Sequence, residues 1–285
     1  MKRWANRLGL SALVLLCGCG GGGYQAATRG ATGGATGGSG GASSPPPSSG
    51  PNVEGNWQFT MTSTVSGPPL TMGGSIRPSG SSVSGAVHID GSKCFDPPST
   101  VGLTGTLTGS NLSLTATSVD GQVITLSGNI SDNTFTATHL PGEFIGTYAI
   151  NGGCAGGDKG NVTGVIVPSL AGNWAGDLTS ETGDTNRLTV TLAQGAANSE
   201  GIFGLSGTAF FEVGTCFKSA KIRPGTFPSG SYTVGRDVSL EIETDNGVIV
   251  FVGTSGHGGL IRGNYTLAGS SCEPAGTAYL SPWEY

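Results

Sequence analysis

The sequence predicts an all-β protein: two tandem eight-stranded antiparallel meander barrels that follow a disordered tether. Three observations predict this fold class. Apolar and polar residues alternate with a period of two, short turns rich in Asn, Asp and Gly separate the alternating runs, and the same series of landmarks occurs twice. A pair of β-sandwiches built from the same strands is the alternative.

Residues 1–18 have the pattern of an export signal. Three basic residues precede the apolar run LGLSALVLL at 8–16, which is too short to span a bilayer. The segment LCGC at 16–19 resembles the lipobox of bacterial lipoproteins. This resemblance implies that the Cys19 thiol receives a diacylglycerol, that the chain is cut before Cys19, and that the new amino group is acylated, for example with palmitate. A plain secretory signal with two incidental cysteines is the alternative.

Residues 19–52 are expected to form a disordered tether. The stretch is rich in Gly, Ser and Pro and contains almost no apolar residue that could be buried. A flexible coil of this length has a reach of about 30 Å. Gly20 follows the cysteine where some lipoproteins have Asp, which in that family is compatible with transport to an outer membrane. We therefore expect a lipid-anchored protein of the cell envelope, attached to the cell outer membrane through Cys19.

Two internal repeats follow, 53–168 and 169–285. The tripeptide GNW begins both, and later landmarks recur in the same order: SGAVHIDGSKCF at 84–95 and SGTAFFEVGTCF at 206–217, TGTLTGSNLSLTATSVDGQVI at 104–124 and SGSYTVGRDVSLEIETDNGVI at 229–249, GTYAINGGC at 146–154 and GNYTLAGSSC at 263–272. Agreement in order, spacing and residue type indicates a duplication.

Each repeat is expected to contain eight half-buried strands. In DVSLEIET at 237–244, every second residue is apolar, so the apolar side chains share one face of the strand. In the second repeat we expect strands near 172–180, 186–194, 202–212, 229–234, 237–244, 247–253, 259–268 and 275–281. The first repeat fits the same template, with a seventh strand near 133–150 that is interrupted at Pro141-Gly142.

A meander of eight strands can close into a small barrel that is filled by side chains or holds one small ligand. The G-x-W motif at the start of each first strand resembles that of the calycins, the lipocalins and avidins, in Gly55 and Trp57 and again in Gly172 and Trp174. The lipocalin TDY motif and the pocket tryptophans of avidins are missing, which argues against biotin. We expect both tryptophans to plug the closed end of a barrel, because large aromatic side chains usually serve packing.

Four cysteines follow the export signal, so we expect them to be oxidised. Repeat symmetry favours the pairs Cys94–Cys154 and Cys216–Cys272 among the three possible pairings. In an eight-stranded meander the loops after the third and seventh strands lie on opposite sides of one rim. The bridges are therefore expected to staple lids across the barrel mouths, with the second lid, 213–228, folded inward as an apolar plug. A bridge that merely clips two nearby sheets is the alternative.

Composition excludes several functions. Without the three basic residues of the signal, the chain has 10 basic and 18 acidic residues. It also contains no basic cluster that could neutralise phosphates, so nucleic acid is not an expected partner. The strands are mostly too short to span a bilayer. No catalytic or nucleotide-binding motif appears in context, His88, His139 and His257 are expected in loops without a special role, and no pattern pairs two carboxylates. We expect no enzyme, cofactor or metal ion.

Three functions remain. The first is a lipid-anchored structural or protein-interaction module with an envelope protein as partner. The alternative is a calycin-like carrier of a small apolar or amphipathic ligand, and an enzyme with a site built from loops comes third.

Overall fold

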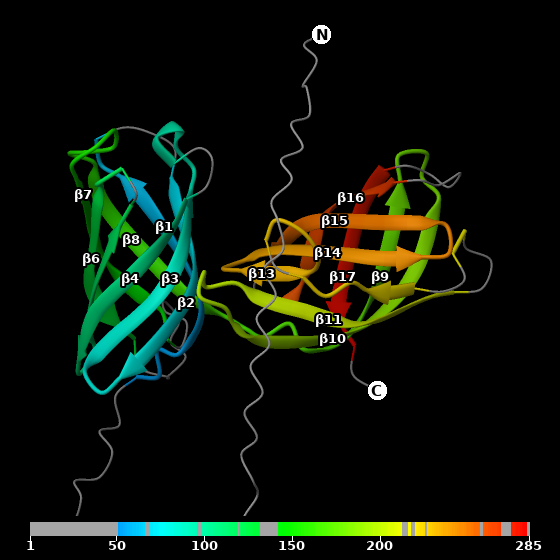
Figure 1. The fold of residues 1–285 in the computed structure, drawn as a ribbon, viewed down its shortest axis with the longest axis horizontal. Coiled ribbons are helices and arrows are strands. Elements are labelled where there is room, and N and C mark those ends of the chain that lie inside the picture. Colours follow the sequence, from blue (N-terminus) through cyan, green and yellow to red (C-terminus); the bar gives the residue numbers. More distant parts are fainter. Residues whose placement is uncertain are drawn as a thin grey trace, which may run out of the picture. The chain divides into compact units, whose positions relative to one another are not determined.

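Two closed barrels of antiparallel strands make up the described part of the chain, as the alternating pattern predicted (Figure 1). The computed structural model describes residues 51–283, except 66–68, 96–98, 119, 132–141, 213–215, 218–219, 226, 257–258 and 269–274. The signal, Cys19 and nearly all of the tether lie outside the described residues, and so do Cys272, His139 and His257. No helix among the described residues is long and apolar enough to cross a membrane.

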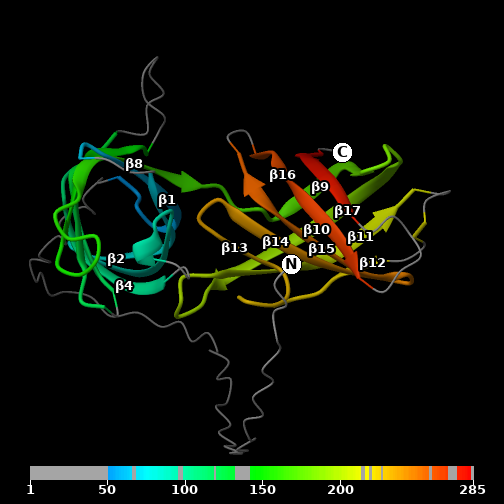
Figure 2. The same cartoon turned by 90° about the horizontal axis from the view of Figure 1, so that it is seen from above.

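The first barrel is an uninterrupted meander. Its strands are β1 (Gly55–Ser63), β2 (Leu70–Ser79), β3 (Ser82–Asp90), β4 (Ser99–Thr108), β5 (Asn111–Thr117), β6 (Val123–Ile130), β7 (Phe144–Asn151) and β8 (Lys159–Val167), with one turn of 3-10 helix, η1 (Lys93–Phe95), after β3. Each strand pairs with the next, and β8 pairs with β1, so the sheet has no free edge (Figure 2).

The second barrel repeats this order with a divided fourth strand. Its strands are β9 (Gly172–Ser180), β10 (Thr185–Ala197), β11 (Phe203–Phe211), β12 (Ala220–Ile222), β13 (Tyr232–Val234), β14 (Asp237–Thr244), β15 (Gly247–Ser255), β16 (Ile261–Ala268) and β17 (Ala275–Pro282). Both β12 and β13 pair with β11 and with β14, while β17 closes the barrel on β9.

The single fourth strand expected at 229–234 is therefore wrong in detail. The chain leaves the sheet between Ile222 and Tyr232, where Pro224 and Pro228 supply no amide N–H for a ladder. Pro224 makes only an isolated bridge to Ser231. The segment between β12 and β13 is thus free to carry side chains away from the barrel wall.

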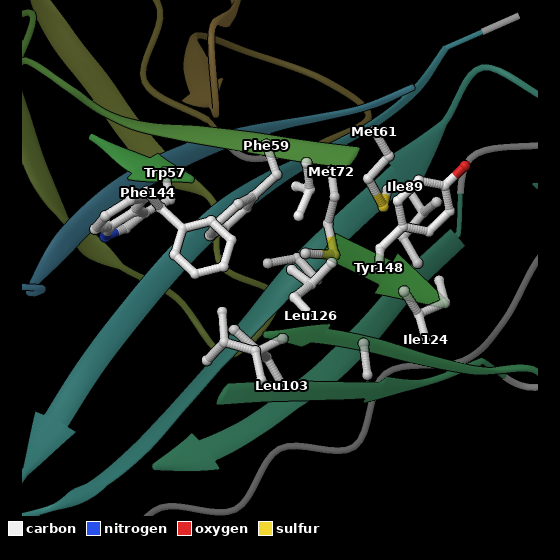
Figure 3. Packing of buried hydrophobic residues seen from close by; sticks show 14 of the residues in the cluster. Trp57, Phe59, Met61, Met72, Ile89, Leu103, Ile124, Leu126, Phe144 and Tyr148 are labelled. Atoms are coloured by element: carbon white, nitrogen blue, oxygen red, sulfur yellow. The ribbon is translucent and has the colours of Figure 1, made fainter. Parts of the chain in front are cut away.

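Side chains fill the interior of each barrel. The inward residues of the first barrel shown in Figure 3 are at most 3% exposed: Trp57, Phe59, Met61, Met72, Ile89, Leu103, Ile124, Leu126, Phe144 and Tyr148. In the second barrel Leu188, Leu240, Ile249, Phe251 and Ile261 are at most 2% exposed. A side chain that faced a void wide enough for a water molecule would keep accessible surface. These positions therefore have almost no surface that a water molecule could reach.

Candidate functional site

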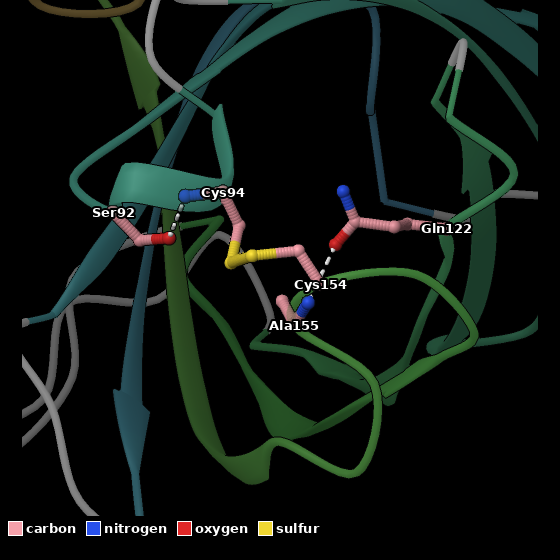
Figure 4. Close-up of a disulfide and its surroundings, with 5 residues drawn as sticks. All are labelled: Ser92, Cys94, Gln122, Cys154 and Ala155. Atoms are coloured by element: carbon pink, nitrogen blue, oxygen red, sulfur yellow. Dashed lines mark hydrogen bonds between the residues drawn. A yellow bond between two sulfur atoms is a disulfide. The ribbon is translucent and has the colours of Figure 1, made fainter.

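The mouth of the first barrel is closed by the predicted disulfide. Cys94 in η1 and Cys154 after β7 are joined, with Cα atoms 5.5 Å apart (Figure 4). Because the β3–β4 and β7–β8 loops lie four strands apart on one rim, the bridge crosses the mouth. Phe95, next to the bridge, is 1% exposed and packs into the core. The pairing is confirmed, and the bridge serves a barrel rather than two sheets of a sandwich.

The second mouth is only partly as expected. Cys216 forms a disulfide, but Cys272 lies outside the described residues, so their pairing stays a prediction. Phe217 folds inward, with its ring centroid 4.7 Å from that of Phe211. The expectation that Phe227 is also part of an inward plug is wrong, since this side chain is 48% exposed. The break between β12 and β13 turns it outward.

The G-x-W tryptophans occupy equivalent places in the two repeats. Trp57 donates a hydrogen bond from Nε1 to the carbonyl of Val53 at 2.8 Å, and Trp174 donates from Nε1 to the carbonyl of Leu170 at 2.9 Å. Trp57 is completely buried and stacks on Phe59, and Trp174 is 4% exposed. Gly55 and Gly172 begin the strands on which these indoles lie. The plug role of the four residues stays a prediction.

A buried amide contact joins the two barrels, which belong to one unit, Ser48–Tyr285. The amide of Asn56 on β1 is 3% exposed; its Nδ2 donates to the carbonyl of Gly235 at 2.7 Å, and its Oδ1 accepts from the N–H of Gly235 at 2.7 Å. Gly235 lies in the β13–β14 turn with φ +55°. Beside it, Gln58 Oε1 accepts a hydrogen bond from the N–H of Arg236 at 2.9 Å.

The turn fits against the first barrel because glycine faces glycine. A Cβ on Gly73 of β2 would lie 2.9 Å from the Cα of Gly235, closer than real Cβ contacts. In the second repeat the strand register puts Thr189 at the place of Gly73 and Asn173 at the place of Asn56. Asn173 is partly exposed and accepts a hydrogen bond from Thr191 instead. The receiving surface is therefore a property of the first repeat alone.

Replacing Asn56 by Ala is expected to lower the free energy of unfolding by about 1–3 kcal/mol, because it leaves the buried N–H of Gly235 without a partner and leaves the carbonyl of Gly235 with only the long hydrogen bond from Thr233 Oγ1, at 3.4 Å. Asn173→Ala is the matched control and should cost less than about 1 kcal/mol, since its hydrogen bond is exposed. Denaturant unfolding monitored by tryptophan fluorescence measures both. Equal costs for the two variants would contradict the buried contact.

A pocket of about 110 Å³ opens beside this contact, and we call it the junction pocket. Residues from both repeats line it: Gln58, Thr71, Gly73, His88, Asp90, Phe227, Tyr232, Val234 and Asp237. The ring of Phe227 lies 5.9 Å from that of His88 and 6.0 Å from that of Tyr232, in edge-to-face arrangements. The divided fourth strand thus brings an aromatic side chain of the second barrel against the outer face of the first.

Burial perturbs the titratable groups of the junction pocket. It raises the pKa of the Asp237 carboxyl, and the negative charge of Asp90 raises it further. Burial lowers the pKa of His88, although a hydrogen bond and the charge of Glu200 act in the opposite direction. Burial also raises the pKa of Tyr232. Shifted groups gathered in a hollow are typical of functional sites. In the described part of the chain, no three His, Cys, Asp or Glu side chains come together to hold a metal ion.

Asp237→Asn is expected to raise the melting temperature at neutral pH. The folded-state pKa of Asp237 lies above its ordinary value of 3.8, so the ionised form costs stability above the folded pKa, and this cost disappears below pH 3.8. The gain should therefore be present at neutral pH and vanish in acid. Thermal unfolding at neutral pH and at a pH below 3.8 measures the difference in melting temperature. Asp120→Asn, in an exposed turn, is the control. A stability loss in Asp237→Asn at neutral pH would contradict the direction of the shift.

The sequence did not point to the junction pocket. His88 lies on β3 rather than in a loop, and Asp90 and Asp237 come together although they belong to different repeats. Their approach depends on how one barrel packs on the other, which a strand pattern does not encode. One signal was available: the repeats differ at Gly73, where the second copy has a bulky Thr189.

Fold and site together define a tandem antiparallel β-barrel protein with a candidate binding site on its outer surface, at the contact of the two repeats. No family model matches the chain, and no curated protein and no solved structure resembles it significantly.

Proposed function

We propose that the protein is a non-catalytic interaction module of the cell envelope, anchored by lipid on Cys19 to the cell outer membrane, a destination with which Gly20 after the cysteine is compatible. The observation that carries the proposal is the filled interior: the described inward side chains of both barrels are buried against one another. A calycin-like carrier needs an internal cavity, commonly of roughly 300–1,000 Å³. The packed interiors thus favour the interaction module over the carrier.

The outer surface supports the same proposal. The described groups with perturbed pKa values at the junction pocket face outward from both barrels, and Phe227 stays exposed there. Surface sites of this kind suit contact with another molecule at the envelope, whereas the closed barrels supply a rigid support for them.

The lipid anchor is tested by replacing Cys19. The Cys19→Ala variant is expected to lose lipid labelling and to leave the membrane fraction or accumulate unprocessed, because LCGC then lacks the modified thiol. Cys17→Ala is the matched control, since Cys17 is discarded with the signal, and it should be labelled normally. Metabolic labelling with a radioactive or clickable fatty acid, followed by fractionation, measures the outcome. Normal labelling of Cys19→Ala would refute the anchor.

A further inference from the structure

The junction pocket contains two carboxylates that no described cation neutralises. Asp90 and Asp237 line the same small space, and neither forms an ion pair with any residue that the structure describes. On the same strand as Asp237, Glu241 and Glu243 are both paired with Arg223, at 3.2 and 3.4 Å. The negative charge of the junction pocket is therefore available to a positively charged ligand.

Aromatic rings form the wall next to these carboxylates. Phe227 makes edge-to-face contacts with His88 on one side and Tyr232 on the other. Aromatic rings attract organic cations through their quadrupole, and a cation that is partly removed from water gains most from them. Burial lowers the pKa of His88, which keeps its imidazole neutral and adds no positive charge that would repel such a cation.

The size of the junction pocket limits what it can hold. Its volume of about 110 Å³ is well below that of sites for drug-sized ligands, roughly 300–1,000 Å³. The end of an aliphatic chain with its charged group fits this space. A larger hollow of about 320 Å³ lies beside Thr254 and Arg262, but Arg262 is the one titratable group among the described residues that line it. Among the described hollows, only the junction pocket has two carboxylates beside several aromatic rings. The hollow of about 140 Å³ at Glu54 and Phe203 has one of each, together with the cation of Arg77.

We propose that the junction pocket binds an aliphatic ammonium group, presented either by a lysine-type side chain of a polypeptide or by a free amine. The carboxylates of Asp90 and Asp237 accept its charge, and Phe227 and Tyr232 enclose its methylene groups. This inference rests on the proposed interaction module and names the class of ligand that the module binds. Ligand binding by the purified chain does not depend on the lipid anchor. Its failure would therefore leave the assignment of Cys19 unaffected.

The test is a titration of the purified full chain, with its disulfides intact, by n-butylammonium and by N-acetyl-lysine N′-methylamide. Amide NMR signals of the pocket backbone, including Gly73, report binding. Saturable shifts are expected with both cations, and none with the neutral analogues 1-butanol and N-acetyl-norleucine N′-methylamide. Tighter binding of the lysine derivative would assign the ligand to a polypeptide, and equal binding would assign it to a free amine.

Two matched pairs of variants make the test specific. Asp237→Asn should weaken ammonium binding at least about tenfold, and Asp120→Asn should not change it. Phe227→Ala should weaken binding about threefold, and Phe210→Ala, which removes another exposed ring outside the pocket, should not. The proposal is overturned if no saturable binding occurs, if the neutral analogues bind as well as the cations, or if a control variant loses as much affinity as its partner.

Discussion

Replacing Cys94 and Cys154 together by Ser is expected to lower the free energy of unfolding by about 4 kcal/mol in the chain-entropy treatment of a 60-residue loop. The bridge restricts the unfolded chain, and in the folded barrel it ties the β3–β4 loop to the β7–β8 loop across the mouth. This is a large fraction of the total stability of a domain of this size. Denaturant unfolding of the oxidised protein and of the double variant measures the difference.

Ser92→Ala is the control for this prediction. It removes the hydroxyl oxygen that accepts a hydrogen bond from the N–H of Cys94 in the same loop, but it leaves the bridge in place. Its cost should be about 1 kcal/mol or less. A double cysteine variant no less stable than Ser92→Ala would show that the bridge does not hold the barrel together.

Trp57→Ala is expected to cost about 3–5 kcal/mol, because it leaves a cavity at a position with no exposed surface. Trp57→Phe should cost less, because it keeps most of the ring contact with Phe59, although it loses the Nε1 hydrogen bond to Val53. Trp174→Ala should resemble Trp57→Ala if both tryptophans plug their barrels. Thermal or denaturant unfolding measures all three, and a cost below about 1 kcal/mol for both alanine variants would contradict the plug role.

Much of the fold could be predicted because alternation is local. The strand expected at 237–244 is β14 with the same bounds, and its buried Val238, Leu240 and Ile242 are the residues that the pattern placed inward. The Cys94–Cys154 bridge followed from repeat symmetry and was confirmed. The division of the fourth strand was not predicted. It arises because Pro224 and Pro228 have no amide N–H to donate to a neighbouring strand, and the alternation of apolar and polar residues does not report such missing hydrogen bonds.

The candidate site could not be predicted in the same way. Asn56 and Asn173 are the middle residues of the two copies of the GNW tripeptide. Asn56 is buried in the contact between the barrels, whereas Asn173 is partly exposed. The difference arises from the β13–β14 turn, which approaches only the surface that has a glycine at position 73. The raised pKa of Asp237 likewise depends in part on a neighbour from the other repeat, Asp90.

Amide hydrogen exchange at the two equivalent turns tests the central claim, which is that the repeats join through the β13–β14 turn and thereby build the junction pocket. The N–H of Gly235 donates a hydrogen bond to Asn56 in the contact between the barrels. The equivalent Gly109, between β4 and β5, lies in open space, since a Cβ added to it would meet no atom within 4 Å. The structure predicts strong protection of Gly235, fast exchange of Gly109, and loss of the Gly235 protection in Asn56→Ala. Exchange of Gly235 as fast as that of Gly109 in the unmodified protein would contradict the claim.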